Sequence, residues 1–224
     1  MTAVKTLIAF GRKITGKRNT SDAPKSNTAT DADLWCCQGE CCQPGKDNTM
    51  QVLSDIQANL TTRSGVQLRV RQALPADEML VADFFAHVTP EDLSFRFLSG
   101  MKEVSHERLQ AITCADDPRS INFLAFSPAD VLVAVGALAI DESLLRGEVA
   151  LSVRADHKHL GVSWTLLSHI AHYAERRGLK SIESVESRAN RAAIKLEREM
   201  GFEITQVPDD PTLVLVRREL QSGI

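Results

Sequence analysis

Aromatic residues and excess positive charge are both scarce in this chain of 224 residues. One Tyr and two Trp offer few rings on which nucleobases could stack. The formal net charge is -3, whereas nucleic-acid-binding domains usually carry a clear positive excess. No apolar run approaches the roughly 20 residues of a membrane-spanning helix. The sequence therefore argues against a nucleic-acid partner and a transmembrane segment, and its 43% hydrophobic and 25% charged residues indicate an ordinary globular protein.

Residues 1–64 differ from the rest and predict a flexible N-terminal tail. Residues 2–18 are basic and contain no acid, which leaves a membrane-surface helix and a disordered tail open. Gly11 and Gly16 interrupt the short apolar pattern and favour the disordered tail. Residues 19–33 have the composition of a linker.

Four of the five cysteines lie within seven residues, at Cys36, Cys37, Cys41 and Cys42. A thiolate metal or redox site is one interpretation. A zinc ribbon needs two separated Cys-x-x-Cys pairs, so a flexible thiol-rich segment is favoured and no metal is expected. Nothing else suggests secretion, so we expect reduced thiols and a cytoplasmic location.

Residues 65–222 predict one folded domain. Thr89 and Pro90 open a helix as N-cap and first helical residue, and Pro75 and Ser105 open two more. We expect strands near 66–72, 121–126, 131–140, 148–154, 180–185, 203–207 and 212–220, and further helices near 164–177 and 188–200. This order predicts an α/β domain with a mixed, mainly antiparallel central sheet and flanking helices.

The segment from Glu148 to Gly178 predicts a strand, a turn and a helix. The strand ends near Arg154, and the turn contains Gly161. Apolar residues then recur at the spacing of one buried helix face. A glycine turn that leads into a helix directs backbone N–H groups and a positive dipole end at one point, so the segment predicts an anion site.

This segment resembles the acyl-CoA-binding core of the GNAT acyltransferases. That family carries Gln/Arg-x-x-Gly-x-Gly/Ala at the turn, which corresponds here to Lys158 through Ser163. Lys158 and Ser163 depart from the pattern. His159 stands where many relatives have Gly, which implies a stiffer loop. The resemblance covers the whole folded region and implies the GNAT, or acyl-CoA N-acyltransferase, fold.

Within this family the chain is most similar to bacterial Pat-type protein-lysine acetyltransferase domains. Four stretches carry that similarity: Glu91–Phe97, Ser105–Glu107, Glu148–Asp156 and Asn190–Phe202. The resemblance implies acetyl-CoA as co-substrate and acetylation of lysine side chains of a protein such as an acyl-CoA synthetase. A small-amine N-acetyltransferase and a non-catalytic acyl-CoA-binding regulatory domain are the alternatives. Oligomeric state is not predicted.

Glu148 stands at the strand position that holds the general base in these relatives. Such a base removes the proton that keeps an amine from attacking a thioester. The alternative is a solvated strand-end Glu paired with Arg146. Many GNAT enzymes place a Tyr general acid where this chain has Glu197; the CoA thiolate is a fair leaving group, so the difference weakens the interpretation only slightly.

The resemblance also implies contacts with the coenzyme. The backbone of the Glu148 strand bonds the pantetheine amides, because this strand and the next one splay apart in the family. Loop N–H groups grip the pyrophosphate, and Lys158 adds charge or is simply solvated. Asn190 bonds the CoA arm or only caps its helix. The implied CoA-binding residues are Leu151, Ser152, Val153, Lys158, His159, Leu160, Gly161, Val162, Ser163 and Asn190.

Overall fold

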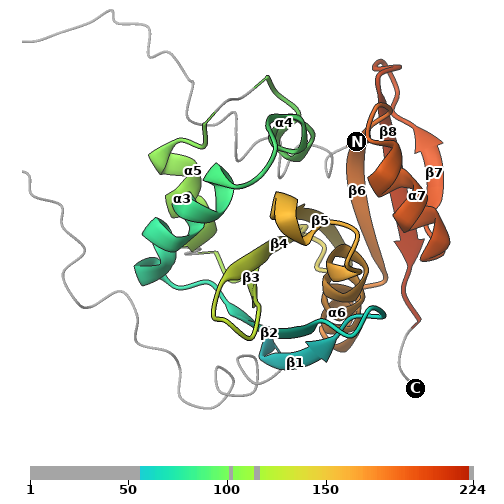
Figure 1. The fold of residues 1–224 in the computed structure, drawn as a ribbon. Coiled ribbons are helices and arrows are strands. Elements are labelled where there is room, and N and C mark those ends of the chain that lie inside the picture. Colours follow the sequence, from blue (N-terminus) through green and yellow to red (C-terminus); the bar gives the residue numbers. More distant parts are fainter. Residues whose placement is uncertain (1–55, 101–102, 114–116, 222–224) are drawn as a thin grey trace, which may run out of the picture.

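The computed structural model describes residues 56–100, 103–113 and 117–221, which form an eight-stranded sheet flanked by helices (Figure 1). The strands are β1 (Ala58–Thr61), β2 (Gln67–Gln72), β3 (Ser120–Phe126), β4 (Leu132–Ile140), β5 (Arg146–Val153), β6 (Ser181–Ser187), β7 (Glu203–Gln206) and β8 (Leu213–Glu219). The helices are α3 (Glu78–Ala86), α4 (Pro90–Phe97), α5 (His106–Thr113), α6 (Val162–Arg176) and α7 (Arg191–Glu199), with short 3-10 turns η3 (Pro75–Asp77) and η4 (Ala155–His157).

The sheet is mixed and mainly antiparallel, which confirms the predicted fold class. Its strand order is β1-β2-β3-β4-β5-β6-β8-β7. Among the described strands only β5 and β6 pair in parallel, and α6 connects them as a crossover. Strands β6, β8 and β7 form the orange-to-red end of the sheet, next to α7 (Figure 1).

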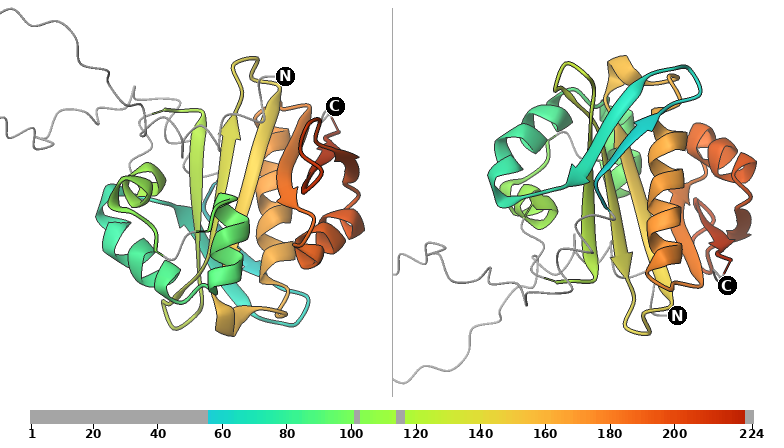
Figure 2. Two further views of the ribbon diagram at one scale, coloured as in Figure 1. Left: turned by 90° about the horizontal axis from the view of Figure 1, so that it is seen from above. Right: turned by 90° about the horizontal axis from the view of Figure 1, so that it is seen from below.

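Helices cover both faces of the sheet (Figure 2). An apolar cluster on each face holds them against it. Helices α3, α4 and α5 cover one face, where Phe84, Phe85 and Leu93 pack against Leu124 and Val135. Helix α6 covers the other face with the apolar stripe that the sequence predicts.

The sheet begins earlier than the sequence predicts. Strand β1 pairs antiparallel with β2, and Ile56 is fully buried, although both lie before the expected start near Gly65. The four residues of β1 include only one large apolar side chain, Leu60, and alternate between half-buried and exposed. A pattern this short does not predict a strand by itself. Strand β1 forms because β2 offers it a hydrogen-bonding partner.

Several sequence predictions lie outside the described residues. They concern the basic segment at 2–18, the linker at 19–33 and the thiol-rich segment from Cys36 to Cys42. Among the residues that are described, no helix is both long and apolar enough to cross a bilayer.

Candidate active site

Strands β5 and β6 form a fork in the sheet. Their parallel pairing covers Arg146 to Glu148 only, and Glu148 opposite Glu183 is the last pair among the described residues. Beyond it β5 runs on to Val153 and β6 to Ser187. The predicted splay is therefore present, and it opens at Glu148.

The backbone of β5 faces this fork at alternate residues. Asp141 N–H donates to the Arg146 carbonyl at 2.9 Å, and Arg154 N–H donates to the Val133 carbonyl at 2.9 Å, so even-numbered residues of β5 bond toward β4. Because a strand's polar groups alternate in direction, Leu151 and Val153 direct theirs toward β6, where the pairing has ended. These are polar groups that a pantetheine arm could bond.

Strand β5 ends at Val153, close to the predicted end near Arg154, and the 3-10 turn η4 follows. The extended part beyond Glu148 spans about 17 Å at ~3.3 Å per residue. The residues after η4 then lead into α6.

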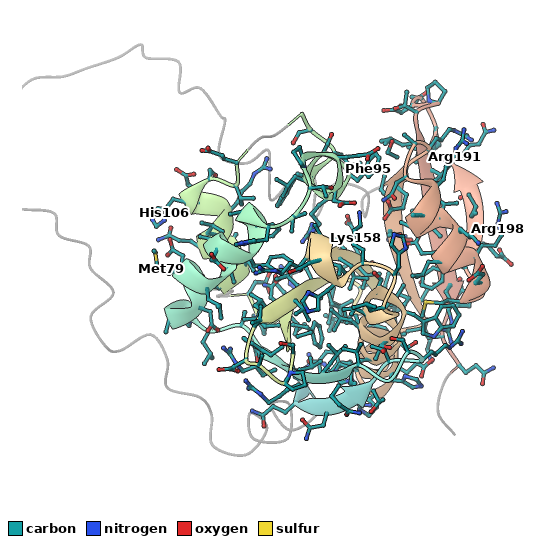
Figure 3. All side chains as sticks on the ribbon, viewed as in Figure 1. Met79, Phe95, His106, Lys158, Arg191 and Arg198 are labelled. Atoms are coloured by element: carbon teal, nitrogen blue, oxygen red, sulfur yellow. The ribbon has the colours of Figure 1, made fainter. Side chains whose placement is uncertain are left out.

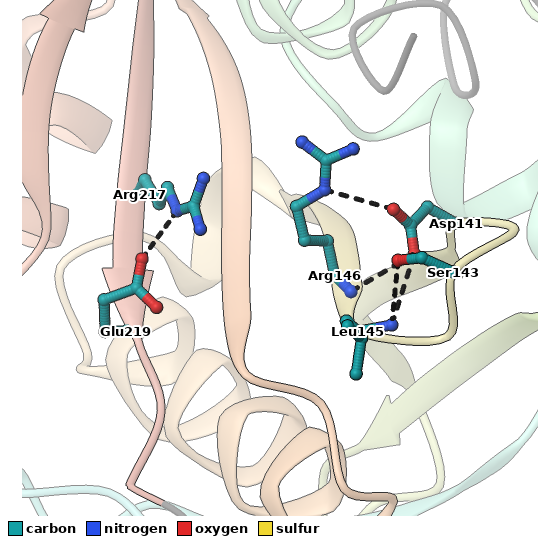
Figure 4. A network of polar contacts seen from close by, with 6 residues as sticks. All are labelled: Asp141, Ser143, Leu145, Arg146, Arg217 and Glu219. Carbon is teal, nitrogen blue, oxygen red and sulfur yellow. Dashed lines mark hydrogen bonds and ion pairs between the residues drawn. The ribbon is translucent and has the colours of Figure 1, made fainter.

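Glu148 is buried, with 9% of its surface exposed, so the solvated strand-end interpretation is wrong. Its neighbour Gly147 faces Leu138 and Leu179 in the α6-side core, and alternation therefore directs Glu148 to the opposite face, toward α4. Arg146 Nε donates to Asp141 Oδ2 at 3.1 Å (Figure 4).

The β4–β5 turn holds the start of β5 in place. Asp141 Oδ1 accepts from the Ser143 hydroxyl at 2.7 Å and from the N–H groups of Leu145 and Arg146 at 3.3 and 3.2 Å (Figure 4). Burial would raise the pKa of Asp141, but these donors outweigh it and lower the pKa. A charged, fully bonded Asp141 fixes the strand two residues before Glu148.

The loop before α6 has the backbone of an anion site. His159 and Gly161 both adopt positive φ, at 63° and 79°. Gly161 is the N-cap of the 15-residue helix α6 and offers no side chain to its first turn. The N–H groups of Val162 and Ser163 therefore lack intrahelical partners and lie at the positive end of the helix dipole. His159 holds a conformation that glycine adopts more easily. The stiffness expected of the loop stays a prediction.

The turn between β1 and β2 supports this loop from outside. Ser64 Oγ donates to the Leu160 carbonyl at 2.6 Å, and a Cβ on Gly161 would lie 3.4 Å from Thr62 Cβ. The guanidinium of Arg63 stacks 4.0 Å above the Trp164 ring at the start of α6. Arg63 lines the cavity described next and was missed in the sequence, because it falls in the segment expected to be tail.

A cavity of about 830 Å³ runs through the fork. Phe95 of α4 and Lys158 of the loop both line it (Figure 3). Every predicted site residue lines it except Leu160, whose carbonyl is bound to the β1–β2 turn. The structure thus brings Glu148, the anion loop and Asn190 to one space, large enough for a cofactor arm.

Four polar atoms in the cavity wall are buried and have no hydrogen-bond partner in the part of the chain that the structure describes. They are Arg96 Nε, Ser99 Oγ, Ser152 Oγ and Glu197 Oε2. Buried polar atoms are usually satisfied, so these four atoms are available to bond a ligand or water that enters the cavity.

A sequence profile of the acetyltransferase (GNAT) family matches residues 85–202. The chain belongs to the GNAT acetyltransferase family. It is 31% identical to a Pseudomonas aeruginosa protein described as an acetyltransferase, over 159 residues that cover 70% of this chain and 86% of that protein. The chain is therefore an N-acetyltransferase, and acetyl-CoA is the acyl donor of its family.

Solved structures show the same GNAT fold. The GNAT domain of PAT from S. lividans superposes with a TM-score of 0.68 at 23% identity, covering 73% of this chain and 97% of that one. An acetyltransferase from Thermus thermophilus gives 0.58 at 22% identity, covering 72% and 98%. Spermidine N-acetyltransferase from Vibrio cholerae, solved with CoA and spermine, gives 0.55 at 17% identity, covering 67% and 92%. At these identities the likeness concerns the fold.

Two predicted coenzyme ligands of this GNAT enzyme have partners within the protein. Lys158 Nζ lies 2.6 Å from Asp92 Oδ2, so it is neither simply solvated nor free. Asn190 caps α7 by accepting from Ala193 N–H at 3.3 Å and donates Nδ2 to Glu186 Oε2 at 2.8 Å. The cap is confirmed, and a bond from Asn190 to the CoA arm stays a prediction.

Burial shifts the pKa values of three ionisable side chains that line the cavity. Desolvation raises the pKa of Glu186 to about 7, against the hydrogen bond from Asn190 and the positive charge of Arg96. Desolvation and the negative charge of Glu186 raise the pKa of Glu197 to about 8. Desolvation lowers the pKa of Arg96 to about 10, although Glu148 and Glu186 oppose the shift. The sequence analysis gave neither Arg96 nor Glu186 a role in the site, because their environment comes from elements far apart in the chain.

No group of three or more His, Cys, Asp or Glu side chains that could hold a metal ion occurs among the described residues. Tyr173, the one tyrosine, is fully buried and packs edge-on against Phe123 at 5.4 Å between ring centroids.

Proposed function

We propose that this enzyme acetylates lysine side chains of a protein, for example an acyl-CoA synthetase, and that Glu148 is the general base. The observation that carries the proposal is the position of Glu148, buried at the point where the fork opens and facing α4. A lysine amine arrives protonated and must lose a proton before it attacks the thioester. A carboxylate at the fork is placed to accept that proton, directly or through a water.

In this proposal CoA lies along the fork. The N–H groups of Gly161, Val162 and Ser163 hold the pyrophosphate, and His159 and Leu160 shape the loop that presents them. The pantetheine arm runs beside Leu151, Ser152 and Val153 toward Asn190. The N–H groups of β5 that face the fork also stabilise the oxyanion formed when the amine adds to the thioester carbonyl.

The charge on the α4 side favours a lysine over a polyamine. Arg96 and Arg108 both line the cavity there and flank the Phe97 ring at 5.3 and 4.9 Å. A polyamine would bring additional ammonium groups toward these guanidinium groups, whereas a lysine in a polypeptide brings one. A small amine is the second candidate, because Glu186 and Glu197 offer carboxyl groups in the same cavity.

The test measures thiol release from acetyl-CoA with three acceptors: a lysine-bearing acyl-CoA synthetase, spermidine and free amino acids. We expect release with the protein and a background rate with the others. If thiol is released with spermidine and not with the protein, the acceptor is a polyamine and the proposed protein acceptor is wrong. Absence of CoA binding in calorimetry would overturn the site itself. A cytoplasmic location stays a prediction.

A further inference from the structure

Beyond Glu148 the cavity continues across β4 to β3, on the face of the sheet that α4 and α5 cover. Six residues of its wall pair in two rows across these three strands: Ser120, Ala139 and Glu148 in the first row, and Asn122, Ala137 and Ala150 in the second. Residues between them along the strands, such as Phe123 and Leu138, pack in the α6-side core, so alternation turns both rows toward α4 and α5. We refer to these six residues as the trough.

Small side chains form the floor of the trough. They are Ala137, Ala139 and Ala150, and all three line the cavity. In the next row Leu124 pairs with Val135, and these larger side chains pack against the helices and close the trough on that side. On the opposite side Ser120 is only half-buried, so an acceptor can reach the trough there from the surface.

Asn122 places a buried polar group in the wall of the trough. The residue is only 5% exposed and lines the cavity. Its backbone carbonyl accepts from Ala73 N–H at 2.9 Å, whereas its side-chain amide has no hydrogen-bond partner in the part of the chain that the structure describes. A buried amide without a partner is costly. Because an amide offers both a donor and an acceptor, it is suited to bond a peptide group.

The width of the trough matches the length of one lysine side chain. Neighbouring strands lie ~4.8 Å apart, so β3 and β5 are separated by roughly 10 Å across β4. An extended lysine side chain spans ~6 Å from Cα to Nζ, and a hydrogen bond of ~3 Å at its peptide end bridges the rest. A chain of this length that is held at Asn122 therefore brings its amine to Glu148.

We propose that the trough is the acceptor channel, in which a lysine side chain lies across β4 on the alanine floor and the Asn122 amide bonds the peptide group of that lysine. The inference rests on the lysine acetylation proposed above and deepens it, because Asn122 then selects a lysine held in a polypeptide over a free amine. Asn122 acts on binding of the acceptor and takes no part in proton transfer.

The first experiment compares two acceptors that differ in their peptide groups. Nα-acetyl-lysine methylamide carries both peptide groups of a lysine within a chain, and n-butylamine is the lysine side chain alone. The enzymes are wild type, Asn122→Ala and Asn59→Ala, which changes an exposed asparagine of β1 outside the cavity. In Asn122→Ala we expect the ratio of kcat/KM for the blocked lysine to that for n-butylamine to fall roughly 3- to 10-fold, through a higher KM. Asn59→Ala should keep the wild-type ratio.

A second variant fills the trough and leaves Asn122 in place. Ala139→Leu puts a larger side chain on the floor, so kcat/KM should fall about 10-fold or more for the blocked lysine and for a lysine-bearing protein. Calorimetry should show a nearly unchanged affinity for CoA, which also establishes that the variant is folded. Ala129→Leu, in the exposed β3–β4 turn, is the matched control.

The outcomes separate the channel from the proposed function. An unchanged acceptor ratio in Asn122→Ala would overturn the peptide contact, and full activity in Ala139→Leu would place the acceptor elsewhere. Turnover of n-butylamine without turnover of the blocked lysine or the protein would also contradict the channel. A wild type that binds CoA but releases no thiol with any amine would instead overturn the proposed function on which the channel rests.

Discussion

Lys158 Nζ and Asp92 Oδ2 lie 2.6 Å apart, and this ion pair ties the phosphate loop to α4 across the mouth of the cavity. The side chains are 37% and 25% exposed, so solvent and salt can weaken the pair. A CoA phosphate that binds at the loop must compete with Asp92 for the ammonium group.

Asp92→Asn should therefore tighten CoA binding by about 2- to 5-fold, because it frees Lys158 for the phosphate. Lys158→Met should weaken binding by about 3- to 10-fold, and the double variant should behave like Lys158→Met. Calorimetry at two salt concentrations measures these affinities. An unchanged affinity in Asp92→Asn would show that Lys158 makes no phosphate contact.

Glu148→Gln should lower kcat by about 10²-fold or more and leave the affinity for CoA nearly unchanged, because only proton abstraction is lost. Steady-state thiol release and calorimetry on the same preparations separate the two effects. Glu142→Gln, an exposed carboxylate in the β4–β5 turn, is the matched control. Equal turnover in both variants would remove Glu148 from the mechanism.

The sequence predicted those parts of the site that one short segment builds. Gly161 and the apolar spacing after it lie within one strand, loop and helix, so the local pattern was sufficient to predict the glycine turn and α6. The anion site at this turn stays a prediction. The role of Glu148 came from the resemblance to a family, and its burial could be seen only in the structure. Family membership confirms the expected enzyme class, whereas the roles of individual residues stay predictions.

Other parts of the site depend on elements far apart in the chain. Strand β1 has one large apolar residue and exists because β2 pairs with it, so Arg63 could not be placed beside Trp164 in advance. The pKa of Glu197 is raised by burial and by the charge of Glu186. Neither cause can be inferred from the position of Glu197 in the sequence of α7. Sequence periodicity predicts helices and strands, but it does not show which ionisable side chains become desolvated in the fold.

Gly161→Ala should weaken CoA binding, because the φ of 79° is unfavourable for Ala and the new Cβ lies 3.4 Å from Thr62 Cβ. Gly178→Ala is the matched control, with a φ of 81° and nothing within 4 Å of its Cβ. Both changes should lower the free energy of unfolding by roughly 1–2 kcal/mol. Only Gly161→Ala should reduce affinity, by about 10-fold or more, as calorimetry would show. Equal affinities would mean that the loop backbone tolerates the displacement.

Glu197 should make the folded protein less stable as pH rises. Its pKa is raised from 4.5 to about 8 by burial, so between these values the folded state holds a proton that the unfolded state has lost. The stabilising contribution of protonated Glu197 to the free energy of unfolding is therefore largest below about pH 4.5. Between pH 4.5 and about pH 8 it falls by up to ~1.4 kcal/mol per pH unit, and above about pH 8 it is lost. Glu197→Gln stays neutral and should gain stability over wild type by a few kcal/mol between pH 5 and pH 9, as urea midpoints would measure. Asp77 has a pKa lowered below 3.8, so it changes the stability only at lower pH. Its effect is the same in both proteins and does not alter the difference between them. A constant difference between the two proteins across this range would show that Glu197 is ionised in the folded state.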